Sequence, residues 1–167
     1  MIEESIDYKN YHESIISLFT IDKGKVKILL VRKQTEPYRG YWILPSDFVP
    51  VNQTLEGVLQ ELVYDKIGYQ DFYMEQCHTF SRLDRDPDDR VIATSYIGLL
   101  DSTTAILKRE ERPEVESAWF DINEIPKVGY DHEEVIRYSI DRLRSKIVNS
   151  TVLKSLFPSD FTLPEIQ

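Results

Sequence analysis

The sequence predicts an α/β fold, an α/β/α sandwich in which helices cover both faces of a mixed β-sheet. The order of its segments is the first reason: strand-like segments, a helix-like segment, further strand-like segments and a second helix-like segment. The second reason is size and composition. The chain has 167 residues, of which 41% are hydrophobic and 29% charged, and this suits one domain with a buried core.

The first two strands are predicted to form a hairpin. Residues His12–Thr20 and Lys25–Arg32 are rich in residues that favour strands, and Asp22–Gly24 between them has the composition of a turn. A loop containing Pro and Gly follows around Tyr41–Leu44. This apolar stretch is too short for a helix, so it predicts a brief strand.

The first helix is predicted from Thr54 to Ile67. Thr54 can accept a hydrogen bond from a backbone N–H of the first turn, and Glu56 lies favourably at the positive end of the helix dipole. Gly68 provides a stop. Apolar residues recur at steps of three and four, so the helix is amphipathic, with a buried face of Leu55, Val58, Leu59, Leu62 and Val63.

Three more strands are predicted, at Phe72–Arg82, Arg90–Leu100 and Val115–Phe120, and a very polar loop separates the first two. The second helix begins at Asp131, because Asp131 and Glu134 form a capping-box pattern. Its buried stripe is Ile136, Ile140, Leu143 and Ile147.

Residues 1–148 are therefore predicted to form one domain. The last seven residues, Phe161–Gln167, contain a Thr cap, a Pro in the first turn and a Glu three residues after the cap, as a helix start does. We expect residues 149–167 to be a linker and the beginning of a second domain, cut at its first helix. The alternative is a frayed C-terminus.

Charge and composition exclude several classes. The formal net charge of -9 and the pI near 4.9 oppose nucleic-acid binding through this segment, because phosphate contacts depend on clustered Lys and Arg. No apolar run approaches the roughly 20 residues of a membrane-spanning helix, and the acidic N-terminus does not resemble a secretory signal. A cytoplasmic protein without membrane contact is expected. The single cysteine, Cys77, cannot form an internal disulfide.

Three segments, Leu44–Val49, Thr54–Glu56 and Glu61–Tyr69, resemble the loop–helix–loop signature of the Nudix family, with matching spacing. In that family, carboxylates on the helix hold a divalent metal ion against a pyrophosphate. Magnesium held in this way stabilises charge on phosphoryl oxygens and activates water. The resemblance implies a Nudix-type sandwich.

The residues at the catalytic positions depart from the family pattern. Only one acidic group remains among the usual ligands, and Lys66 would place a positive charge where a dication should lie. Glu61 and Asp65 share a helical face and are the candidates for a weak metal site. We therefore expect no catalytic residues and no cofactor, with an amphipathic packing helix as the outcome. The signature glycine, loop glutamate, arginine, first helical glutamate and later glutamate pair fall on Asp47, Gln53, Glu61, Leu62 and Asp65–Lys66.

A closer resemblance is to Nudix-related bacterial transcriptional regulators, which sense ADP-ribose or a pentose such as arabinose. The similar stretches are Gly40–Pro45 with Phe48–Val49, Met74–Gln76 with Phe80, Asp84–Pro87 with Arg90–Val91, and Trp119–Pro126 with Asp131–His132. Leu156–Leu163 resembles the entry to the C-terminal winged helix of these regulators. The resemblance implies a homodimer that binds a small-molecule effector in the former catalytic cleft. It would contact DNA only through a winged-helix domain absent from this chain.

The loop Arg82–Arg90 interleaves three arginines with four aspartates. Arginines can bind phosphate in a fork geometry and aspartates can accept from sugar hydroxyls, which would suit a sugar or nucleotide-sugar ligand. The alternative is a self-neutralising turn held by local ion pairs. Aromatic residues at strand positions either supply a stacking face or belong to the core. The candidate ligand-binding residues are Arg32, Trp42, Asp47, Phe48, Arg82, Asp84, Arg85, Arg90 and Tyr96.

Three functions remain open. The first is a non-catalytic sensor of a sugar or an ADP-ribose-like compound. The second is a Nudix hydrolase of ADP-ribose or another nucleoside-diphosphate-linked compound, with magnesium bound by Glu61, Asp65 and loop aspartates. The third is a protein-interaction module with an empty cleft.

Overall fold

Strand β1 (Tyr11–Asp22) is the centre of the sheet. In the computed structural model, which describes residues 5–106 and 116–149, it pairs antiparallel with β2 (Lys25–Arg32) and parallel with β6 (Val91–Leu100). The turn between β1 and β2 consists of Lys23 and Gly24, both at positive φ, as in a two-residue type I′ hairpin turn. The predicted hairpin is confirmed.

The strand order is β3-β2-β1-β6-β5, where β3 is Trp42–Ile43 and β5 is Tyr73–Phe80. Two further strands lie off this path: β4 (Ser46–Phe48) pairs with β1, and β7 (Ser117–Asp121) pairs with β2. The parallel β1–β6 pair makes the sheet mixed, as predicted. Strand β4 was not predicted, and Val115, the expected start of β7, lies outside the described residues.

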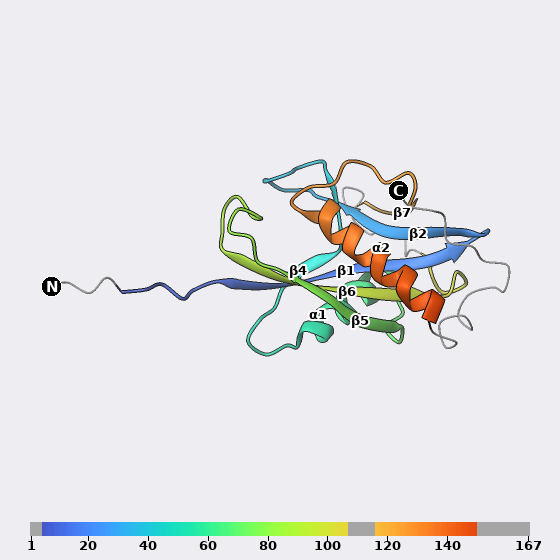
Figure 1. The fold of residues 1–167 in the computed structure, drawn as a ribbon, viewed down its shortest axis with the longest axis horizontal. Coiled ribbons are helices and arrows are strands. Elements are labelled where there is room, and N and C mark those ends of the chain that lie inside the picture. Colours follow the sequence, from blue (N-terminus) through green and yellow to red (C-terminus); the bar gives the residue numbers. More distant parts are fainter. Residues whose placement is uncertain (1–4, 107–115, 150–167) are drawn as a thin grey trace.

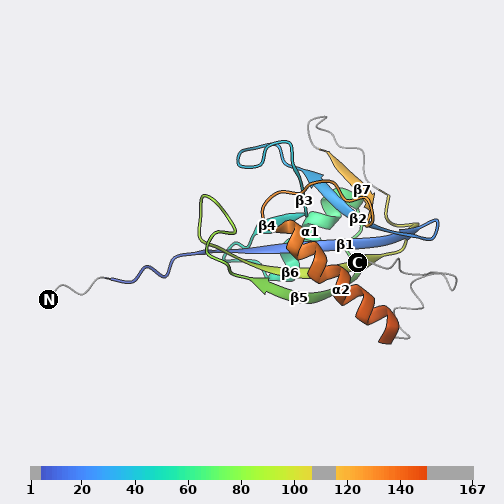
Figure 2. The ribbon, with the colours of Figure 1, turned by 45° about the horizontal axis from the view of Figure 1, so that its top comes forward.

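The two helices lie on opposite faces of the sheet (Figure 1). Side chains alternate along β1, so Ile15 and Phe19 pack with helix α2 (His132–Asn149), while Ile16 and Leu18 pack with helix α1 (Leu55–Ile67). Figure 2 shows α2 in front of the strands and α1 behind them. The α/β/α sandwich is confirmed.

Both helices begin where the sequence predicts. The Thr54 hydroxyl accepts a hydrogen bond from the Gly57 N–H at 3.0 Å, and Gly68 ends α1 in the left-handed conformation at φ 82°. Val58, Leu59, Val63 and Ile67 form the buried face of α1; Ile136, Ile140 and Leu143 are buried on α2, with Ile147 partly buried beside them. Neither helix within the described ranges is long and apolar enough to span a bilayer.

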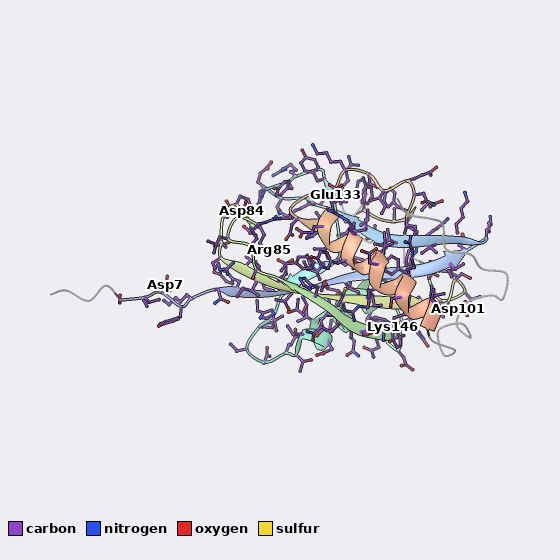
Figure 3. The ribbon with its side chains drawn as sticks, in the orientation of Figure 1. Asp7, Asp84, Arg85, Asp101, Glu133 and Lys146 are labelled. Atoms are coloured by element: carbon purple, nitrogen blue, oxygen red, sulfur yellow. The ribbon has the colours of Figure 1, made fainter. Side chains whose placement is uncertain are left out.

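A buried ion pair fastens the loop between β5 and β6 to the start of α2. The guanidinium of Arg85 donates to both carboxylate oxygens of Asp131, at 3.0 and 2.9 Å, and the two side chains are 2% and 4% exposed. Figure 3 places Arg85 on the side of the loop near α2, whereas the preceding residue, Asp84, lies farther out. Arg85 therefore provides the buried attachment of the loop to α2, and Arg82 adds an exposed ion pair with Glu134 of the same helix.

His132 makes a second attachment to α2. Its Nδ1 accepts a hydrogen bond from the Leu44 N–H at 3.0 Å, and the histidine is 1% exposed. Burial lowers the pKa of His132 to about 4, so the ring is neutral at pH 7 and Nδ1 can accept. The segment between β3 and β4 is thereby attached to α2.

Removing one partner of the buried pair should destabilise the protein strongly. Arg85→Met leaves the Asp131 carboxylate buried without its cation, and we expect the free energy of unfolding to fall by about 3–5 kcal/mol. Arg85→Met/Asp131→Leu removes both charges and should recover much of this loss. Urea denaturation measures both values.

Arg82→Met is the matched control, because Arg82 belongs to the same loop but is 61% exposed in its ion pairs with Asp84 and Glu134. Its loss should be below about 1 kcal/mol. Equal losses for Arg82→Met and Arg85→Met would show that the buried pair does not anchor the loop.

Candidate functional site

A cavity of about 330 Å³ opens where β1 begins and β4 ends. Its walls come from four parts of the chain that are distant in sequence. They are the start of β1, the segment from β3 to β4, the loop after β2, and the loop between β5 and β6, with Tyr130 closing the side next to α2. Loops carried by a rigid sheet are a common location for binding sites.

The charge of the cavity is strongly negative. Lys33 is its one cationic lining residue among those described. Its ammonium group donates to the carbonyl oxygens of Pro37 at 2.7 Å and Thr35 at 3.1 Å. The acidic lining residues are six, Glu13, Glu36, Asp47, Asp86, Asp88 and Asp89.

Glu13 is a half-buried lining residue of the cavity. The register of β1 and β4 places it opposite Phe48, and strand alternation puts it on the face that Ile15 shares with α2. Burial raises the pKa of Glu13 to about 7; the nearby Arg85 guanidinium acts in the opposite direction, and Asp131 and Asp86 raise the pKa further. A large fraction of Glu13 therefore holds a proton at neutral pH.

The acidic loop has a defined local shape. The Asp86 carboxylate accepts hydrogen bonds from the backbone N–H groups of Asp88 at 2.8 Å and Asp89 at 3.1 Å, which closes an Asx turn around Pro87. Because this turn and the Arg85 anchor set the loop backbone, the three aspartates are carried at one wall of the cavity.

Two aromatic rings line the cavity. Phe48 is 44% exposed and stacks against Tyr11 with ring centroids 5.0 Å apart. Tyr130 packs against Tyr38 at 4.6 Å, and its positive φ of 53° is an uncommon backbone conformation for a bulky residue. Burial, reinforced by neighbouring carboxylates, raises the pKa of Tyr130 to about 12. The phenol thus remains a hydrogen-bond donor at neutral pH.

Of the nine candidate ligand-binding residues, Asp47 and Phe48 line this cavity. Tyr96 lies on the opposite face of the sheet, where it is 2% exposed and donates to Glu56 at 3.0 Å. Trp42 packs against Phe120, with the Arg32 guanidinium 5.8 Å from its ring centroid.

The arginines have partners outside the cavity. Arg32 pairs with Glu116, and Arg82 pairs with Asp84 and Glu134. Arg90 donates to the carbonyl oxygen of Ser81 at 2.9 Å. None of these side chains, nor that of the buried Arg85, is among the residues that line the cavity.

Glu13, Lys33 and Tyr130 were not among the candidate residues. Glu13 carried a usable signal, because it is a charged residue next to the apolar run of a strand and its alternation places it on the same face as Ile15. Lys33 and Tyr130 had no local signal. Tertiary packing alone brings them to the cavity.

Helix α1 does not supply a magnesium site of the kind that the Nudix signature implies. The Gln53 amide donates to both carboxylate oxygens of Glu61 at 3.0 Å, so this carboxylate is already engaged. Leu62 packs against the core below α1. Within residues 5–106 and 116–149, no group of three or more His, Cys, Asp or Glu side chains could hold a metal ion. The residues present do not fit a catalytic dication.

The sandwich and its loop–helix–loop segment define a Nudix-type domain. Residues 10–139 match the model of the NUDIX domain family, so the chain belongs to this family.

Its relatives include both regulators and enzymes. The chain is 26% identical over 156 residues to the ADPR responsive transcriptional repressor NtrR of Acinetobacter baylyi, covering 91% of this chain and 62% of the relative. It is 29% identical over 130 residues to the ADP-ribose pyrophosphatase of Methanocaldococcus jannaschii, covering 78% of this chain and 75% of the relative. The chain thus spans less than two thirds of the repressor's length.

A solved structure confirms the fold. The NUDIX domain of Shewanella oneidensis NrtR, crystallised with ADP ribose, superimposes with a TM-score of 0.72 at 22% identity, covering 82% of this chain and 90% of that domain. At this identity the likeness speaks for the fold alone.

The raised pKa of Glu13 predicts a pH-dependent effect of Glu13→Gln. The folded protein keeps this proton up to about pH 7, whereas the unfolded chain loses it near pH 4.5, so the contribution of Glu13 to stability falls as the pH rises through this range. Glutamine does not titrate. We expect the variant to gain on the order of 2 kcal/mol relative to wild type between pH 5 and pH 8.

Chemical denaturation at the two pH values measures this gain. Glu36→Gln is the matched control, since its side chain lines the same cavity but is 73% exposed. The interpretation fails if Glu13→Gln and Glu36→Gln have the same pH dependence.

Proposed function

We propose that this chain is the non-catalytic effector-binding domain of a transcriptional regulator, and that it senses a sugar or an ADP-ribose-like small molecule. The observation that carries the proposal is the chemistry of helix α1. It offers an apolar Leu62 and a cationic Lys66 at positions where magnesium would require anionic oxygens, and Glu61 is bonded to Gln53. The helix packs the fold without equipping it for hydrolysis.

The relatives support a sensor. One is named for its response to ADPR as a repressor, and the NUDIX domain of Shewanella oneidensis NrtR, which has the same fold, has been crystallised with ADP ribose. The cavity of this chain is the place where we propose that the effector binds. The proposed protein is cytoplasmic and homodimeric, needs no cofactor, and contacts DNA through a domain beyond these residues. Residues 149–167, proposed as the linker to that domain, lie almost wholly outside the described part of the chain.

A sensor requires coupling between the ligand and the dimer. A ligand changes an equilibrium only if it prefers one of two arrangements, since equal affinity for both changes nothing. In this chain the cavity loops are attached to the start of α2 through Arg85–Asp131 and Leu44–His132. A ligand that moves these loops would therefore also move the beginning of α2.

The alternative function is a Nudix hydrolase with an atypical metal site, and the pyrophosphatase relative favours it. It would need Glu61 to leave Gln53 and to combine with Asp65 and loop aspartates, in an arrangement that the described residues do not have.

Two measurements on the full chain separate these functions. We expect calorimetric titration with ADP-ribose and common pentoses to give saturable binding of at least one compound. We expect no hydrolysis of ADP-ribose or dinucleotides above background with Mg²⁺ or Mn²⁺. Turnover that is abolished by Asp65→Asn would establish the enzyme, and silence across the ligand panel would count against the sensor.

A further inference from the structure

The charge of the cavity bears on the kind of ligand it can hold. An effector with a phosphate or diphosphate needs cationic partners, which in proteins are usually arginine forks, lysines or helix N-termini. The arginines of this region are bonded elsewhere: Arg85 to buried Asp131, Arg82 to Asp84 and Glu134, and Arg90 to a backbone carbonyl.

The carboxylates that line the cavity disfavour the binding of a phosphate group. Asp47, Asp86, Asp88 and Asp89 line the space together with Glu13 and Glu36, and Lys33 is the single cationic lining residue in the described part of the chain. Asp47, Asp88 and Asp89 are exposed and Asp86 is half-buried, so these carboxylates keep contact with water, but charges of one sign gathered around a concave site add up to a negative potential that repels anions. A phosphate group placed here would face this repulsion.

The same groups suit hydroxyls. Carboxylate oxygens accept hydrogen bonds from sugar hydroxyls, and the Tyr130 phenol and the Lys33 ammonium can donate to them. Burial raises the pKa of Glu13 to about 7, so this carboxyl can donate as well as accept near neutrality. The ring of Phe48 stacks against Tyr11 and is partly exposed, so the C–H face of a sugar can pack on it.

The size of the cavity agrees with a small ligand. Ligand pockets are typically about 300–1,000 Å³, and a volume of about 330 Å³ lies at the lower end of this range. This favours a ligand of monosaccharide or nucleoside size over a dinucleotide-sized one.

Building on the proposed sensor function, we propose that the cavity selects an uncharged, hydroxyl-rich ligand and discriminates against phosphorylated compounds. The carboxylates of Asp88 and Asp89 are specificity-determining groups in this proposal. They accept from ligand hydroxyls, and their charge disfavours phosphate.

Matched ligand pairs test this selectivity directly. Adenosine and AMP differ only by the phosphate, and ADP-ribose extends the series to a diphosphate. Titrations of the full chain in EDTA should show that the phosphate-free member of a pair binds at least tenfold more tightly. Raising the salt concentration should strengthen the binding of phosphorylated compounds, because it screens repulsion, and should leave the neutral ligands unchanged.

Charge-removing variants identify the residues responsible. Asp88→Asn and Asp89→Asn keep the side-chain shape, and together they should raise the affinity for the phosphorylated member of a pair about tenfold relative to the neutral member. Asp84→Asn is the matched control: it removes the same charge from the same exposed loop, but Asp84 is paired with Arg82 and is not a lining residue. Its effect should be less than twofold. Thermal denaturation of each variant verifies that it folds.

The outcomes distinguish the two proposals. Tighter binding of ADP-ribose than of every neutral compound in EDTA would overturn the charge selectivity and leave the sensor function standing. ADP-ribose binding that needs Mg²⁺ would overturn it as well, because the carboxylates would then hold a bridging cation. If no compound in the panel binds, both proposals fail.

Discussion

Three consecutive residues, the two that precede α2 and its first residue, hold the walls of the cavity in place. Tyr130 packs against Tyr38 of the loop after β2, Asp131 binds Arg85 of the loop between β5 and β6, and His132 accepts from Leu44 between β3 and β4. The buried ion pair is the most demanding of these contacts. A charge removed from water is tolerated only while its partner is present, so the position of the acidic loop depends on α2 being in place.

The two faces of the sheet differ in role: one packs against α1 and the other borders the cavity. Helix α1 covers one face and keeps its buried residues Val58, Leu59 and Val63, which account for the retention of the Nudix fold. The positions on that helix that would hold a metal ion carry other side chains, and this leaves the packing of the helix against the sheet intact. The cavity lies on the α2 side of β1 and contains no lining residue from α1, so changes in its lining leave the packing of α1 in place.

Most of the fold was predictable because its signals are local. The turn at Lys23–Gly24, the cap at Thr54, the stop at Gly68 and the apolar periodicity of α1 each concern residues a few positions apart. Strand β4 was not predictable in this way. It is three residues long, and it exists because β1 offers it a pairing edge.

The sequence by itself determined the α/β/α sandwich, the family and the absence of the usual metal-binding carboxylates on α1, since all of these depend on spacing along the chain. Only the tertiary structure decided which polar residues meet. Arg85 is buried against a partner 46 residues away in the sequence, Tyr96 faces α1, and Glu13 faces the cavity beside Phe48. The physical reason is that alternation along a strand tells which residues share a face, whereas the groups they meet on that face depend on pairing between distant segments, which the local sequence does not encode.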